Sequence, residues 1–264
     1  MFDELKPHII ELRKRLMIAA LAILIGLLAA FAFWEYIMLW ITQPLASAIC
    51  STNATMPSLG EFDISNLCNS KQTMITTNVV EGLFTAFKIS FFAGLVAAMP
   101  IIFWQLWLFI APGLYDHEKK YVLPFVFFAT LMFLLGFLFC YYIVLPMSLD
   151  FIIYFGEGIF VYIPKTTEYI DFFLKFTLAF SLSFELPVIS LFLAKINFIT
   201  DKTLKSFFRY AVVLIFIFAA IITPPDVISQ ILMAIPLLLL YALSILIAHL
   251  VNPYKEEDEQ NTPA

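Results

Sequence analysis

The sequence predicts an all-α membrane protein with six transmembrane helices, and two observations carry this prediction. The 264 residues are 62% hydrophobic and 13% charged, with a mean hydropathy of +0.94. Soluble domains are about 45–50% apolar and about 25% charged, so this chain has too little polar surface to cover a globule in water. Charged residues also divide the sequence into six apolar segments, and a bilayer core needs about 20 apolar residues per helix.

The six helices are predicted at about 16–42, 79–110, 121–147, 168–194, 207–222 and 227–249. They would form one membrane domain over residues 1–250, followed by an acidic cytoplasmic tail over 251–264. Prolines within or near the ends of these segments remove helical hydrogen bonds, so we expect bent helices that form a concave wall. These prolines are Pro100, Pro124, Pro146, Pro187 and Pro236.

The distribution of basic residues predicts that both termini lie on the cytoplasmic side. With the N-terminus inside, 11 of the 15 Lys and Arg residues fall on inner segments. Basic residues near membrane spans are retained in the cytoplasm, which favours this orientation. The first outer loop would then cover about 43–78 and the second about 148–167, and a third, minimal turn would hold Pro224 and Pro225.

The fifth segment has an unusually short charge-free stretch, from Tyr210 to Pro225. About 16 helical residues reach roughly 24 Å, less than the roughly 30 Å of a hydrocarbon core. Either the bilayer is thinned there, or Lys205 and Arg209 extend their charged ends to the membrane surface and make up the length.

The three cysteines fall in two environments. Cys140 lies in an apolar run and is predicted to be a small core residue. Cys50 and Cys68 flank the polar first outer loop, where a periplasmic location would permit a disulfide. The alternative is two free thiols.

Glu185 is the most unusual residue of the apolar segments, because a carboxylate inside a bilayer costs a few kcal/mol and should face a cavity or a partner. Thr177 and Ser181 precede it at a spacing of four, which predicts one polar stripe on a helix. This stripe is either an intramembrane polar site that binds a partner helix or water, or a protonated acid bonded to a neighbouring helix. Nearby, Asp171 and Lys175 are predicted to form an i,i+4 ion pair.

Two further carboxylates are expected at the inner membrane surface. Glu11 directly precedes the first apolar segment, among basic residues. Glu118 follows the tight turn that Pro112 and Gly113 predict at the end of the second segment. Two carboxylates on one face could accept two guanidinium groups through bidentate, charge-assisted hydrogen bonds, a geometry that suits arginine better than lysine.

Other function classes find no support in the sequence. The net charge of −5 argues against nucleic-acid binding. The three histidines lack metal-ligand spacing, and motifs of zinc proteases, P-loop proteins, serine hydrolases and dinucleotide-binding proteins are missing. We therefore predict a protein without enzymatic activity or a metal site.

Four motifs, in order and spacing, resemble those of the TatC family, the multispanning core subunit of the twin-arginine protein translocase. The first covers 8–16 (HIIELRKRL), and the second covers 105–115 (QLWLFIAPGLY) with HEKK following at 117–120. The third covers 183–187 (SFELP), and the fourth covers 223–227 (TPPDV) with SQ at 229–230. The resemblance extends from about His8 to His249.

This resemblance implies a receptor that binds signal peptides bearing two consecutive arginines and supports the export of folded proteins, driven by the proton-motive force. It implies TatA- and TatB-type single-span partners, an oligomeric complex with no cofactor, and a location in the bacterial inner membrane. Glu11 and Glu118 would form the cytoplasmic peptide site, supported by Arg13, Phe109 and Lys119. Glu185 would be the intramembrane polar site, and Pro44 and Asp226 would belong to the outer face.

The segment from about Ala46 to Lys71, which carries Cys50 and Cys68, looks like an insertion relative to a compact family member. The alternative function is a proton-coupled secondary transporter that uses Glu185 as a proton relay. Such transporters usually contain inverted repeats, which six unequal segments without internal similarity do not suggest.

Overall fold

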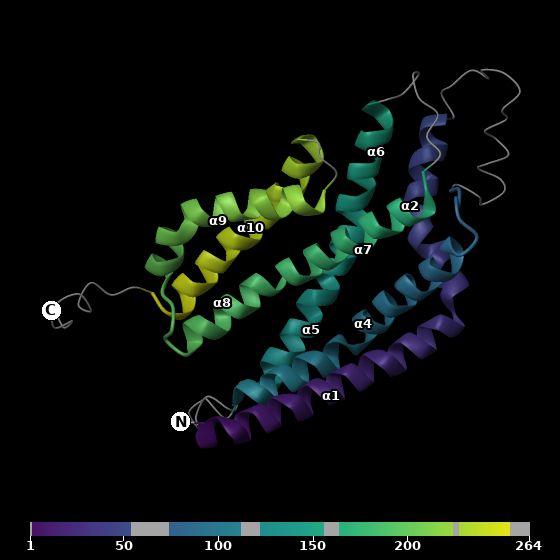
Figure 1. The fold of residues 1–264 in the computed structure, drawn as a ribbon. Helices are drawn as coiled ribbons and strands as arrows, with labels where there is room; N and C mark the ends of the chain where they lie inside the picture. The colour runs from purple at the N-terminus through teal and green to yellow at the C-terminus, as the bar shows by residue number, and fades with distance from the viewer. Residues whose placement is uncertain (1, 54–73, 112–121, 156–163, 224–226, 254–264) are drawn as a thin grey trace, which may run out of the picture. The chain divides into compact units, whose positions relative to one another are not determined.

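The computed structural model describes residues 2–53, 74–111, 122–155, 164–223 and 227–253, and it is nearly all helical over them (Figure 1). The extended pairing in these ranges is one isolated bridge, between Ile75 and Lys165. Six helical stretches are long and apolar enough to span a membrane, which confirms the predicted fold class. They are His8–Ala32, Glu81–Ile110, Leu123–Phe155, Thr166–Lys195, Asp201–Ile222 and Val227–Val251.

The chain divides into two compact units, which we describe separately. The first comprises Met1–Val122 and Leu138–Leu178, and the second comprises Leu123–Phe137 and Ala179–Ala264. The helices of the first unit are α1 (Phe2–Ala32), α2 (Trp34–Asn53), α4 (Glu81–Ile110), η3 (Cys140–Val144), α6 (Leu145–Phe155) and most of α7 (Thr166–Ser183). The second unit holds most of α5 (Val122–Phe139), with α8 (Glu185–Lys195), α9 (Asp201–Ile222) and α10 (Val227–Val251).

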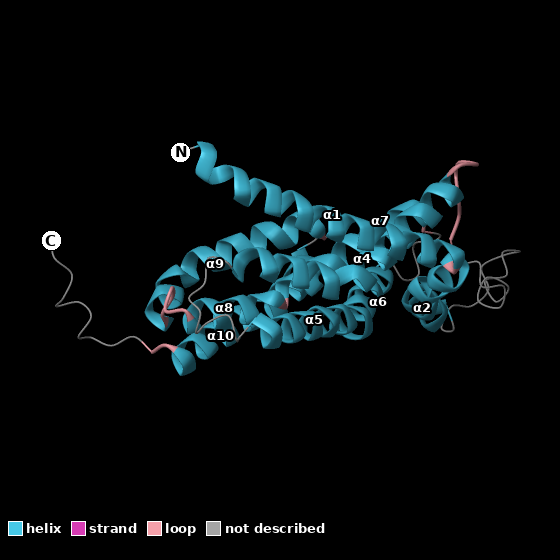
Figure 2. Cartoon of the chain, turned by 90° about the horizontal axis from the view of Figure 1, so that it is seen from below, coloured by secondary structure: helices cyan, strands magenta, loops and turns pink. Residues whose placement is uncertain are grey.

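In the first unit, α1 lies along α4 over much of its length (Figures 1 and 2). Gly26 and Gly94 allow this close approach, since a Cβ atom added to Gly26 would lie 2.8 Å from the carbonyl oxygen of Gly94. Further along, the Phe31 ring stacks on the Phe87 ring at 4.9 Å. Contacts that advance along α1 while receding along α4 make the two helices antiparallel.

The first predicted helix differs from the structure at its C-terminal end. A turn at Phe33 separates α1 from α2, and α2 continues through Pro44 to Asn53, into the region expected to be loop. A proline inside a helix leaves the carbonyl four residues earlier without its usual donor. The Tyr141 hydroxyl donates to that carbonyl, of Trp40, at 2.7 Å, so a tertiary hydrogen bond compensates for Pro44.

Two other helices were predicted too short. The third span passes through the π-helical turn η3 and continues in α6 to Phe155, beyond the expected end at 147. The helix α9 begins at Asp201 and has 22 residues, or about 33 Å, because its first turns carry the charged residues that the charge-free count left out. The Asp201 carboxylate accepts from Lys205 Nζ at 2.7 Å and contacts His249 Nδ1 at 3.0 Å.

In the second unit, α10 packs against α8 and α9. The Tyr241 hydroxyl of α10 donates to the Leu204 carbonyl of α9 at 3.0 Å, and the Gln230 amide donates to the Phe216 carbonyl at 2.9 Å. These bonds tie two neighbouring spans together, and Pro236 lies inside α10 between them.

Candidate functional site

Glu11 lies near the start of the first span and makes one ion pair. Its Oε1 lies 3.1 Å from Nη2 of Arg15, one helical turn later on α1. The side chains of Glu11 and Arg15 are 32% and 24% exposed, respectively. The carboxylate is therefore accessible to water and held by one long, flexible side chain from its own helix.

Arg15 connects this pair to α4. Its Nη1 lies 3.5 Å from Oε1 of the buried Gln105, while its buried Nε has no hydrogen-bond partner. The antiparallel packing of α1 on α4 makes this contact, and it also brings the C-terminal end of α4 to the level of Glu11. The guanidinium group of Arg15 is thus only partly satisfied.

The structure describes only some of the other residues predicted for this site. Arg13 is exposed on α1, and Phe109 is half-buried in the last turn of α4. Glu118 and Lys119 lie outside the described residues, so their position relative to Glu11 stays a prediction.

Glu185 is the first residue of α8 and is 6% exposed. A break at Phe184 separates α7 from α8, so the fourth span is not one continuous helix. The buried Oε1 of Glu185 has no hydrogen-bond partner. A buried carboxyl oxygen without a donor carries a substantial desolvation cost, which marks Glu185 as a group that requires a partner.

Thr177 and Ser181 are both fully buried in α7. The hydroxyl of Thr177 donates to the Phe173 carbonyl of its own helix at 2.6 Å. Thr177 belongs to the first compact unit, whereas Ser181 and Glu185 belong to the second. A single polar stripe through all three residues therefore remains a prediction.

The predictions for the outer-face residues and the cysteines agree with the structure only in part. Pro44 is buried within α2 rather than in a loop after the first span. Asp226 lies outside the described residues. Cys140 is a buried free thiol, as predicted, and Cys50 is disulfide-bonded. Its expected partner, Cys68, lies outside the described residues, so that pairing stays a prediction.

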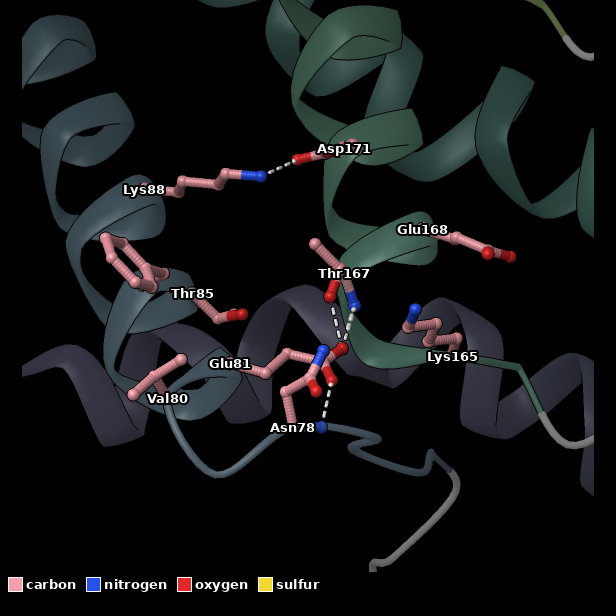
Figure 3. A pocket seen from close by; sticks show the side chains of 10 residues that line it. Asn78, Val80, Glu81, Thr85, Lys88, Lys165, Thr167, Glu168 and Asp171 are labelled. Atoms are coloured by element: carbon pink, nitrogen blue, oxygen red, sulfur yellow. Dashed lines mark hydrogen bonds and ion pairs between the residues drawn. The ribbon is translucent and has the colours of Figure 1, made fainter.

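A second carboxylate site, which was not predicted from the sequence, lies around Glu81 at the N-terminus of α4 (Figure 3). Glu81 is 6% exposed and accepts hydrogen bonds from three residues. The donors are the backbone N–H and hydroxyl of Thr77, the backbone N–H of Asn78, and the backbone N–H and hydroxyl of Thr167. We call these four residues the Glu81 cluster, and it fastens the segment before α4 to the start of α7.

A sequence signal for this cluster exists. Asn78 precedes Glu81 by three residues, directly before an apolar run, and this spacing is typical of a capping box. The acid accepts from the Asn78 N–H at 3.2 Å, which is one of the two bonds of such a box, although α4 begins at Glu81 with Val80 as its N-cap. The contact with Thr167 spans a long sequence separation and has no local signal.

The predicted pair between Asp171 and Lys175 is wrong. Asp171 Oδ1 lies 2.6 Å from Nζ of Lys88 on α4 (Figure 3). Lys175 is exposed. A helical spacing of four permits a pair but does not select it. The packing of the first unit offers Asp171 a better partner from another span.

No group of His, Cys, Asp and Glu residues suited to a metal ion occurs among the residues that the structure describes.

Six apolar spans, with a half-exposed carboxylate at the start of the first and a buried carboxyl in the fourth, define a multi-pass membrane protein with polar sites on its spans. Residues 7–236 match the family model described as Sec-independent protein translocase protein (TatC). The chain belongs to the TatC family.

Relatives are similar over nearly the whole chain. The Sec-independent protein translocase protein TatC of Helicobacter pylori (strain ATCC 700392 / 26695) is 49% identical, with 99% of this chain and 93% of the relative covered. The protein of the same name from Campylobacter jejuni is 46% identical, with 99% and 100% covered.

A solved structure extends this similarity to the fold. A crystal structure of the twin arginine translocase receptor TatC matches with a TM-score of 0.77 and 38% identity, covering 92% of this chain and 99% of that one. The resemblance stated from the four motifs is thereby confirmed at the level of the family.

Proposed function

We propose that this protein is the receptor and core subunit of a twin-arginine translocase, and that it binds Arg-Arg signal peptides at a cytoplasmic site formed by Glu11 and Glu118. The observation that carries the proposal is the state of Glu11. Its carboxylate is half-exposed and already holds one guanidinium group, that of Arg15, at 3.1 Å. A site that accepts an internal guanidinium can accept an external one of the same chemistry.

Binding in this proposal is an exchange of partners. An arginine of the signal peptide replaces Arg15 at Glu11 and gains a charge-assisted bond that a bidentate fork strengthens. Glu118 receives the second arginine, and Arg13, Phe109 and Lys119 form the surrounding surface. Lysine offers a point charge without the planar fork, so it binds more weakly.

Glu185 supplies a second site in this proposal. Its unpartnered Oε1 and the helix break at Phe184 support a role in binding a polar group from a partner helix. The partners are TatA- and TatB-type single-span subunits in an oligomeric complex of the bacterial inner membrane. The proton-motive force drives the export of folded cargo, and the protein itself uses no cofactor and catalyses no reaction.

The test is binding of an Arg-Arg signal peptide, and of its Lys-Lys twin, to the purified protein in nanodiscs. We expect binding of the Arg-Arg peptide only, and weaker binding by the Glu118→Ala variant. Glu35→Ala removes an exposed carboxylate of α2 and is the matched control, with unchanged binding expected. Equal binding of both peptides would contradict the receptor proposal.

The transporter alternative rests on the same buried, unpartnered Glu185. Glu185→Gln keeps the size of the side chain and removes its exchangeable proton. Loss of small-solute transport with intact protein export would favour the transporter. A defect in protein export would favour the receptor and core subunit.

A further inference from the structure

A cavity of about 350 Å³, lined by apolar surface and several charged side chains, lies between the N-terminal ends of α4 and α7 in the first compact unit (Figure 3). We call it the α4–α7 pocket. The candidate spans of these helices begin at Glu81 and Thr166, so the pocket lies at a membrane boundary. Lipid headgroups occupy the boundary of a bilayer. The pocket is also separate from the Glu11 site, since none of its lining residues comes from α1.

The lining of the pocket is strongly charged. Lys88 and Asp171 satisfy each other at 2.6 Å, and Glu81 is satisfied by its cluster. Within the described part of the chain, the side chains of Lys165 and Glu168 have no hydrogen-bond or ion-pair partner. One free ammonium and one free carboxylate therefore line the same cavity.

A third group in the pocket is unsatisfied. Thr85 is 4% exposed, and its hydroxyl oxygen is buried without a hydrogen-bond partner. Figure 3 shows this hydroxyl pointing from α4 toward the start of α7, between the pair of Lys88 with Asp171 and the Glu81 carboxylate. Buried polar groups are normally hydrogen-bonded, so this hydroxyl offers a hydrogen-bonding position that a polar ligand could fill.

An apolar surface continues from the pocket along α4. Phe84 lines the pocket and is exposed, and Phe91 further along α4 is also exposed, whereas Phe87 between them is partly covered by the Phe31 ring of α1. Spacings of three and four place these rings on one face of the helix. A ligand in the pocket with hydrocarbon chains could lay them along this face.

We propose that the α4–α7 pocket binds a phospholipid with an ethanolamine headgroup. The phosphate contacts the Lys165 ammonium, the primary ammonium of the headgroup contacts the Glu168 carboxylate, the Thr85 hydroxyl donates to a headgroup oxygen, and an acyl chain lies on Phe84 and Phe91. A purely anionic headgroup would leave Glu168 opposed to a like charge. A choline headgroup has no N–H to donate to that carboxylate.

The experiment is native mass spectrometry of the full-length protein in detergent with equimolar phosphatidylethanolamine, phosphatidylcholine and phosphatidylglycerol that carry identical acyl chains. We expect one phosphatidylethanolamine to be retained, with about a threefold preference over each other lipid. The double variant Lys165→Gln with Glu168→Gln should lose this preference. A double variant of exposed residues outside the pocket, Lys175→Gln with Glu35→Gln, should keep it.

Thr85→Val supplies an independent measurement, because it removes the orphaned hydroxyl without changing charge. We expect lower retention of phosphatidylethanolamine in this variant. The proposal would be overturned if wild type retained the three lipids equally, or if Thr85→Val retained phosphatidylethanolamine as wild type does. It would also be overturned if the control double variant lost the preference as fully as the pocket double variant. Soluble phosphoethanolamine that displaced the lipid at equal concentration would overturn it too, since the site would then take a soluble ligand.

Discussion

Two carboxylates of the first unit, Glu11 and Glu81, each lie near the start of a membrane span, and their surroundings differ sharply. Glu81 is buried and accepts five hydrogen bonds from three residues. Glu11 is 32% exposed and, among the residues that the structure describes, pairs with the side chain of Arg15. The comparison shows that a charged residue near a span is not in itself a binding site, because a carboxylate whose acceptor positions are filled has nothing to offer a ligand.

The two carboxylates also differ in how easily their partners can be replaced. The partners of Glu81 are mostly backbone N–H groups and short hydroxyls, which cannot move away without unfolding the local turn. The partner of Glu11 is a long side chain that can rotate into water at small cost. We therefore expect the Glu81 cluster to stabilise the fold and Glu11 to remain available to a ligand, so that each can be changed without the other.

The largest expected effect is on peptide binding by Glu11→Ala. Loss of a hydrogen bond to a charged group costs about 1.5–3 kcal/mol, which weakens binding of an Arg-Arg signal peptide by about 10–150-fold. The thermal unfolding temperature should stay within about 1 °C of wild type, because the lost i,i+4 pair is half-exposed. Titration calorimetry and a thermal unfolding curve on one preparation test both. Wild-type affinity in this variant would remove Glu11 from the site.

The second effect is on stability by Glu81→Ala. Two turns lose their common acceptor and leave buried N–H groups unpaired, so we expect an unfolding temperature lower by about 5 °C. Glu168→Ala, at the same pocket but without a hydrogen-bond partner among the described residues, is the matched control and should shift it by less than about 1 °C. Peptide binding at room temperature should be unchanged. If Glu81→Ala unfolded at the same temperature as Glu168→Ala, the Glu81 cluster would not stabilise the fold.

The sequence predicted the six spans because hydropathy over 20 residues depends on composition alone. It could not place their ends where tertiary contacts decide. Helix α2 continues past Pro44 because Tyr141, about 100 residues later, bonds to the carbonyl that the proline leaves free. Helix α9 starts inside a charged stretch because Asp201 is held by Lys205 and His249.

The candidate site divides in the same way. The sequence drew attention to Glu11 because this carboxylate directly precedes an apolar segment, and to Glu185 because a carboxyl within an apolar run is conspicuous on sequence alone. The link from Thr167 to Glu81 and the pair of Lys88 with Asp171 join residues more than 80 positions apart. Only the packing of α4 against the start of α7 brings those groups together.

The third expected effect concerns the pair of Lys88 and Asp171, which is intermediate between the two carboxylates. Both side chains are about 40% exposed, so a double-mutant cycle of Lys88→Ala and Asp171→Ala should yield a coupling of about 0.2–1 kcal/mol. The same cycle with Lys175→Ala in place of Lys88→Ala should yield none. Coupling to Lys175 instead would restore the helical pair that the sequence suggested.

The smallest expected effect is a change in signal-peptide affinity, and it tests directly whether the peptide replaces Arg15 at Glu11. If Arg15 competes with the signal peptide, then Arg15→Gln removes a competitor worth about 0.3–0.5 kcal/mol and tightens Arg-Arg peptide binding by about twofold. Lys14→Gln removes the same charge from an exposed neighbour, whereas the ion pair of Glu11 is with Arg15, so this variant should leave the affinity closer to that of wild type. Arg15→Lys keeps a cation within reach and should behave more like wild type as well. Weaker binding by Arg15→Gln would mean that Arg15 orients the carboxylate for the peptide, which would place it among the residues of the site instead of among its competitors.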